Sequence, residues 1–174
     1  APHDLDGLER PGLDQIEVRY YDDPARVEPI AFPEASYTAG LSDNPEWAVS
    51  KLRLSYESMV SPATTYDYDV AARTFETLKV QEIPSGYDAS LYVTERLEIA
   101  ARDGTLVPVS VVSRKDRKPG GPLHLYGYGA YGISIDAGLS ITSRTNHALY
   151  IDHYPQGRDA TVNYPDLDLR FTND

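Results

Sequence analysis

Glycines and aromatic residues alternate in the stretch "HLYGYGAYGISID", residues 124–136. Glycine at positions 127, 129 and 132 lets the backbone bend sharply and lets another group approach it closely. A tyrosine hydroxyl held among such glycines can donate a hydrogen bond to an oxygen that becomes negatively charged during acyl transfer. The stretch therefore has two interpretations: a structural turn lined by core tyrosines, or one wall of a catalytic site.

A catalytic interpretation also requires a nucleophile. Hydrolases that expose a serine on a sharp strand-to-helix turn carry it in the pattern G-x-S-x-G. The nearest match is "GISID", in which Asp136 stands where the last glycine belongs. The sequence thus supplies a candidate hydrogen-bond donor but not the serine motif that would use it.

The C-terminal part carries side chains that could form an improvised Ser-His-Asp site, because triads are recognised by geometry and not by chain order. The candidates are Ser134, Ser140, His147, Asp152 and His153. Their spacing in the sequence is too irregular to indicate a catalytic site. The histidines and Asp152, with Asp159 added, are also too irregularly spaced to indicate a metal site, and the chain has no cysteine that could serve as a ligand. We favour solvated side chains here and predict neither a cofactor nor a metal.

Composition limits the classes of partner. The 174 residues carry a formal net charge of −11, and no cluster of Lys and Arg offsets it, so we expect no nucleic-acid partner. No apolar run approaches the roughly 18 residues of a membrane span. The N-terminus also lacks the basic and apolar regions of a signal peptide. We expect a cytoplasmic chain without membrane association, with a secreted or periplasmic origin as the alternative.

Alternation of apolar and polar residues predicts strands and almost no helix. The expected strands are 16–20, 50–59, 64–70, 73–82, 93–101, 105–114, 123–129, 147–154 and 160–174. In 73–82 the apolar positions are Phe75 and, after a change of register, Leu78 and Val80. Asp103-Gly104 predicts a hairpin turn, because glycine adopts positive φ freely.

Three segments in order resemble the oligopeptidase B branch of the prolyl oligopeptidase family of serine peptidases. They are "SYESMVSPATTYDYD" (55–69), similar to the last propeller blade, "YVTERLEIAARDGTLVPVSVV" (92–112), similar to the hairpin that opens the α/β-hydrolase domain, and "LYGYGAYGISID" (125–136), similar to a turn beside the active site. The resemblance runs from about residue 9 to 136, and we do not recognise the tail.

The resemblance implies a fold and a function. It implies a mainly β chain, with antiparallel propeller-type strands in 1–83, a linker at 84–91 and the first strands of an α/β-hydrolase region in 92–144. The unrecognised tail in 145–174 is predicted to be β-rich from its own residue pattern. It also implies that Tyr128 donates to the oxyanion during hydrolysis of peptide bonds after basic residues. In the family, the catalytic serine, aspartate and histidine come later than this segment. We therefore expect a peptidase fragment, truncated or rearranged, that is inactive alone.

Two alternatives remain open. The chain could be a self-associating β-rich binding or assembly protein, because unpaired sheet edges recruit other chains. On that basis we expect a homo-oligomer formed through exposed strand edges. The weaker alternative is a small esterase that uses the improvised site in the tail.

Overall fold

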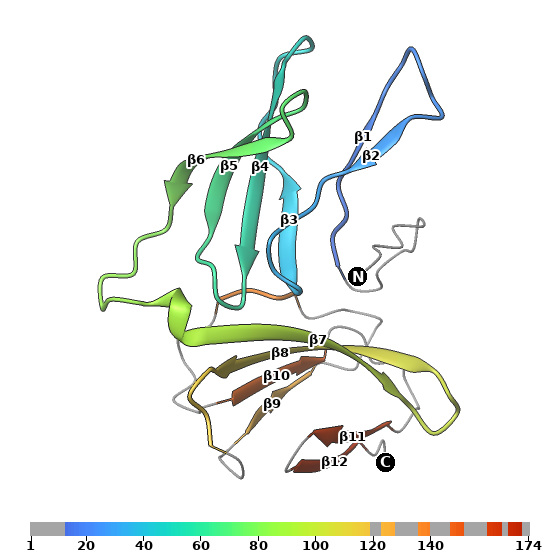
Figure 1. Ribbon diagram of the computed structural model, residues 1–174, viewed down its shortest axis with the longest axis vertical. Coiled ribbons are helices and arrows are strands. Elements are labelled where there is room, and N and C mark those ends of the chain that lie inside the picture. The colour runs from blue at the N-terminus through green and yellow to red at the C-terminus, as the bar shows by residue number, and fades with distance from the viewer. Residues whose placement is uncertain are drawn as a thin grey trace.

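The computed structural model describes residues 13–118, 123–127 and 136–139, together with the backbone of three later strands (Figure 1). The elements are β1 (Glu17–Arg19), β2 (Val27–Pro29), β3 (Tyr37–Leu41), β4 (Lys51–Ser58), β5 (Thr64–Asp69), β6 (Thr74–Val80), the 3-10 helix η1 (Ala89–Leu91), β7 (Tyr92–Ala100), β8 (Leu106–Arg114), β9 (His124–Tyr126), β10 (His147–Ile151), β11 (Ala160–Tyr164) and β12 (Leu167–Phe171). The expected mainly β fold is confirmed. In the described residues, no helix has the length and apolar character that crossing a membrane requires.

The first layer is a four-stranded antiparallel sheet in the order β3-β4-β5-β6, which we call the upper sheet (Figure 1). Its strands alternate as the sequence predicts: Leu54 is fully buried, Tyr56 is almost fully buried, and the intervening Ser55 is exposed. Strand register places Leu54 opposite Tyr66 on the neighbouring strand. One face of this sheet therefore carries the apolar core, and the other carries the charges.

Aromatic rings fill much of that core. Phe32, in the loop before β3, lies 4.8 Å from Tyr37, 5.2 Å from Tyr56 and 5.6 Å from Phe75, measured between ring centroids. Tilted and offset arrangements at these distances contribute about 0.5–1.5 kcal/mol per pair beyond the area they bury. The β1–β2 hairpin adds Ile30, which is buried in the same apolar core.

A bulge interrupts β6. Tyr66 pairs with Thr77 and Thr65 pairs with Lys79, so Leu78 is an extra residue in the ladder. The expected change of register is therefore confirmed. Leu78 and Val80 nevertheless remain 44% and 46% exposed, so of the three apolar positions only Phe75 joins the core.

The second layer, the lower sheet, has the order β7-β8-β10-β9 (Figure 1). The predicted hairpin joins β7 to β8: Gly104 has φ of 84°, and the amide of Thr105 donates to Asp103 Oδ1 at 3.0 Å. One face of β8 buries Val107, Val109 and Val111. β10 pairs antiparallel with β8 and parallel with β9.

The tail also forms strands. β11 and β12 pair as an antiparallel hairpin, and β11 lies against β7. The prediction of extra strands after residue 145 is confirmed by β10, β11 and β12. Segment 81–91, which includes η1, carries the chain from the upper sheet to the lower one.

Candidate functional site at the junction of the two sheets

Two buried serines connect the sheets. Ser36 precedes β3, Ser110 lies in the middle of β8, and both are fully buried. The Ser36 hydroxyl donates to Ser110 Oγ at 2.8 Å. Arg96, opposite Ser110 in the β7–β8 ladder, donates to the same oxygen at 3.1 Å. Ser110 is therefore an acceptor shared by the upper sheet and by its own hairpin.

A second polar group lies around Glu34, two residues before Ser36. The Ser61 hydroxyl donates to Glu34 Oε1 in a short hydrogen bond. The Tyr87 hydroxyl, from the linker, donates to the carbonyl oxygen of Val60 at 2.9 Å. Both contacts tie the loop after β4 to neighbouring segments, so this end of the upper sheet is held by polar contacts as well as by its aromatic core.

Burial and the Glu34 carboxylate favour neutral phenols in this region. Burial raises the pKa of Tyr87 to about 12, with smaller contributions from Tyr92, Asp88 and Glu34. The pKa of Tyr66 is also raised, first by burial and then by Glu34. These tyrosines therefore act as hydrogen-bond donors and not as phenolates at neutral pH.

Three buried polar atoms have no hydrogen-bond partner among the described residues: Glu34 Oε2, the Tyr56 hydroxyl and Ser113 Oγ. Such orphans are uncommon in folded proteins, because an unpaired buried polar group costs about 1–3 kcal/mol. By strand register Ser113 stands opposite His147, the first residue of β10.

The glycine-rich stretch is bracketed by the two sheets. It starts in β9, at the edge of the lower sheet, where Leu125 and Tyr126 are exposed. Residues 136–139, at and just after its C-terminal end, lie below β4 of the upper sheet (Figure 1). A Cβ atom at Gly138 would lie only 3.0 Å from Glu57 Oε1. Ala137 beside it is buried. The stretch therefore connects the same two layers that Ser36 and Ser110 join.

Most of the residues predicted for catalysis lie outside the described part of the chain. These are Tyr128, Ser134, Ser140, Asp152 and His153. His147 is placed by its backbone in β10, in the register given above. Within the described ranges, no group of three His, Asp or Glu side chains could hold a metal. The catalytic roles of all six residues thus remain predictions.

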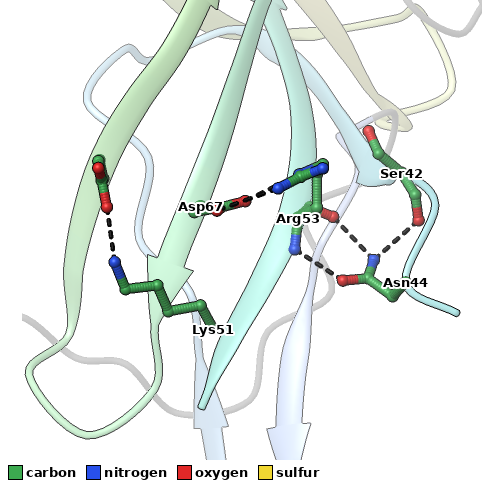
Figure 2. Close-up of polar contacts among 6 residues, drawn as sticks. Ser42, Asn44, Lys51, Arg53 and Asp67 are labelled. Carbon is green, nitrogen blue, oxygen red and sulfur yellow. Dashed lines mark hydrogen bonds and ion pairs between the residues drawn. The ribbon is translucent and has the colours of Figure 1, made fainter. Parts of the chain in front are cut away.

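The outer face of the upper sheet carries a separate polar cluster (Figure 2). Lys51 Nζ lies 2.6 Å from Glu76 Oε2, and Arg53 Nε lies 2.9 Å from Asp67 Oδ1. Hydrogen bonding from Arg53 lowers the pKa of the Asp67 carboxyl below its ordinary value. Exposed pairs of this kind contribute little to stability and are common on charged sheet faces. We interpret this cluster as structural.

Sequence reasoning did not find the residues at the junction. The signal for Ser110 was a polar residue in the middle of the apolar run "LVPVSVV". Ser36 and Glu34 sit in a loop, and no local pattern indicates that their partners lie in distant segments.

Relatives with known names match this chain in part. It is 50% identical over 113 residues to dipeptidyl aminopeptidase BI of Pseudoxanthomonas mexicana, a match that covers 63% of this chain and 16% of that protein. It is 30% identical over 127 residues to protease 2 of Moraxella lacunata, covering 72% of this chain and 18% of that protein.

The structure matches that of oligopeptidase B from Trypanosoma brucei in its closed form. The TM-score is 0.68 at 30% identity, and the match covers 83% of this chain and 22% of that one. Part of this chain is a segment of the prolyl oligopeptidase family. Its antiparallel strands match the propeller region of those oligopeptidases. The chain spans less than a quarter of the length of these prolyl oligopeptidase relatives.

A different family model matches the C-terminal part. The model described as "VanW like protein" covers residues 110–174, which is less than half of the chain. This match includes β10, β11 and β12, the strands of the tail for which sequence analysis identified no family. The chain is therefore similar to the prolyl oligopeptidase family in one part and to a second family over residues 110–174, which begin within β8 and include the tail.

Proposed function

We propose that this chain contributes the junction between the propeller and the hydrolase domain to a serine peptidase that cleaves peptide bonds after basic residues. In this proposal, β3–β6 form the end of the propeller, and β7, β8 and β9 form the first strands of an α/β-hydrolase sheet, to which the tail adds β10. The relatives described above are named as peptidases, which supports the reaction class.

The observation that carries the proposal is the β7–β8 hairpin, whose Val107, Val109 and Val111 form a buried apolar cluster, in a sheet that β9 enters next along the chain. β10, a strand of the tail, pairs parallel with β9. Parallel neighbours need a crossover of a dozen or more residues, and residues 127–146 supply that length. Doubly wound sheets bind ligands beyond the carboxyl ends of such strands, where the strand order is non-sequential. The sequence that follows the carboxyl end of β9 is Gly127-Tyr128.

Tyr128 has a defined role in this proposal. Its hydroxyl donates to the oxyanion of the tetrahedral intermediate, and the flanking glycines leave room for the substrate. The nucleophile comes from a G-x-S-x-G segment that does not occur in these 174 residues. We expect no turnover of a fluorogenic peptide with arginine before the cleaved bond when this chain is assayed alone.

The decisive experiment produces and assays a longer protein encoded by the same reading frame. In a longer product that carries G-x-S-x-G and later Asp and His residues, Tyr128→Phe should lower kcat by about 10²–10³-fold, the effect of removing one oxyanion donor. Tyr131→Phe, in the same stretch, is the matched control and should retain activity. Turnover by the present chain that disappears in Tyr128→Phe would contradict the proposal, and so would equal losses in the two variants.

The match to a second family makes the region near residue 138 informative. Sequencing across the codons for residues 130–150 in an independent copy of the gene tests whether the two parts belong to one continuous frame. If the reading frame continues from the codons for β9 to a G-x-S-x-G segment and does not encode the present tail, the present chain is a rearranged copy of such a gene. The same tail in every copy supports a distinct protein with two family segments.

A second candidate, self-association, is favoured by one observation. β9 forms an edge of the lower sheet, and its Leu125 and Tyr126 are 40% and 48% exposed. A strand that ends the described part of a sheet and carries exposed apolar side chains can be a template for a strand of another molecule. Light scattering at increasing concentration tests this: a strict monomer at high concentration counts against it. Labelling by a fluorophosphonate tests the weaker esterase alternative, and failure to label excludes it.

A further inference from the structure

Two large aromatic side chains are exposed together near the loops of the upper sheet. Tyr21 follows β1 and is 92% exposed, and Trp47 lies in the β3–β4 connection and is 90% exposed. Their rings stack with centroids 6.3 Å apart and planes 24° apart. Large exposed apolar surface mostly marks an interaction site, since its burial is otherwise favourable. We call this pair the aromatic shelf.

The sequence around the aromatic shelf is acidic. Asp22 and Asp23 follow Tyr21, and Asp43 and Glu46 precede Trp47, while 42–50 contains no Lys or Arg. In the part of the chain that the structure describes, no hydrogen bond or ion pair engages the Asp43 or Glu46 carboxylate. The chain as a whole is strongly negative. The charge therefore favours a cationic partner and disfavours nucleic acid or an anionic lipid surface.

The same hairpin already holds one cation between a ring and a carboxylate. The guanidinium carbon of Arg26 lies 3.8 Å from the centroid of the Tyr20 ring, and Arg26 Nη2 lies 2.7 Å from Glu28 Oε1. This arrangement combines a cation–π contact with a charge-assisted hydrogen bond. The aromatic shelf supplies the same kind of ring, including tryptophan, which attracts cations best, and the acidic residues that adjoin Tyr21 and Trp47 in the sequence supply the same kind of anion.

We propose that the aromatic shelf binds an arginine or lysine side chain of a basic, extended peptide segment of another protein. The side chain lies over the Trp47 and Tyr21 rings, and the neighbouring carboxylates, Glu46 among them, neutralise its charge. This docking surface lies in a different part of the fold from the junction at Ser36 and Ser110, and the proposal does not depend on peptidase activity.

Trp47 is the single tryptophan of the chain, so its fluorescence reports on the aromatic shelf alone. The complete chain is titrated with a glycine-spaced peptide that carries three arginines, and with the same peptide in which citrulline, neutral and nearly isosteric, replaces each arginine. We expect a saturable change in Trp47 emission with the arginine peptide, a much smaller one with citrulline, and weakening as salt concentration rises.

Variants locate the interaction. Tyr21→Ala should weaken the binding of the arginine peptide by about two- to fivefold, the range for an exposed cation–π contact. Glu46→Gln should weaken binding and reduce its salt dependence, whereas Glu82→Gln, an exposed acid beyond the far end of β6, should leave both unchanged. Circular dichroism checks that each variant is folded, and Tyr21→Leu provides a second ring deletion if Tyr21→Ala is not.

Three results would overturn the proposal. The first is no change in Trp47 emission with the arginine peptide. The second is an equal change with the citrulline peptide, which would show stacking without recognition of charge. The third is equal weakening in Glu46→Gln and Glu82→Gln, which would show attraction by overall charge and not by the aromatic shelf.

Discussion

Ser110→Ala is the sharpest test of the junction. The change removes the oxygen that accepts from Ser36 at 2.8 Å and from Arg96 at 3.1 Å. Because Ser36 is fully buried, its hydroxyl loses this acceptor without gaining water. We expect a loss of about 1–3 kcal/mol in the free energy of unfolding. Ser36→Ala should cost less, about 0.5–1.5 kcal/mol, because Ser110 then still accepts from Arg96.

The double variant separates this contact from general effects of packing. If the two hydroxyls interact directly, Ser36→Ala together with Ser110→Ala should cost about 1 kcal/mol less than the sum of the single losses. Urea unfolding followed by far-UV circular dichroism measures all four proteins; Trp47 is too exposed to report on the core. Ser50→Ala, at an exposed position directly before β4, is the matched control and should change stability by less than about 0.5 kcal/mol.

Hydrogen exchange gives a second readout. Since the contact joins two sheets, Ser110→Ala should speed amide exchange in β3 as well as in β8, whereas Ser50→Ala should speed it in neither. Additive losses in the double variant would refute the view that this hydroxyl pair joins the sheets. Faster exchange confined to β8 would refute it as well.

Two further predictions concern the upper sheet and the linker. Asn44 Nδ2 donates to the carbonyl oxygens of Ser42 at 2.8 Å and Arg53 at 2.9 Å, and Asn44 Oδ1 accepts from the Arg53 amide at 2.7 Å (Figure 2). Asn44→Asp would place a carboxylate next to two carbonyl oxygens and should lower the free energy of unfolding by about 1–2 kcal/mol. Thermal unfolding measures this loss, with Asp43→Asn as the neutral control. An unchanged midpoint would contradict the prediction. The pKa of Tyr87 is raised to about 12 in the folded state, against about 10 in the unfolded state. The stability that the buried neutral phenol contributes is therefore complete below pH 10 and is lost as the pH rises toward 12. Tyr87→Phe should therefore lose less stability than the wild type between pH 9 and 11 in urea unfolding, and equal losses would count against the assignment.

Strands β4 and β5 of the upper sheet could be predicted because their evidence is local. Alternation in 50–59 and 64–70 marks one apolar face, and the structure buries Leu54, Tyr56 and Tyr68 on it. The Asp103-Gly104 turn was predictable for the same reason, since the positive φ of Gly104 is a property of one residue.

Other elements could not be predicted, because their cause is distant in the sequence. β3 has the sequence "YTAGL", in which glycine and alanine give little strand signal, and its pairing with β4 makes it a strand. The position of β10 between β8 and β9 is likewise set by tertiary pairing. The hydrogen bond from Ser36 to Ser110 spans 74 positions of sequence, so neither local sequence contains it. The role of Tyr128 rests on family resemblance and awaits the kinetic test.

The extra residue in β6 has a consequence for how copies of this molecule meet. A ladder that contains Leu78 twists more strongly than a regular one and offers an incoming strand an uneven row of amides and carbonyls. The charged side chain of Lys79, directly after Leu78, would also lose hydrating water if another strand approached, which is energetically unfavourable. Pairing between copies of the molecule along this side of the upper sheet is thus disfavoured, although β6 is the last strand of that sheet among the described residues.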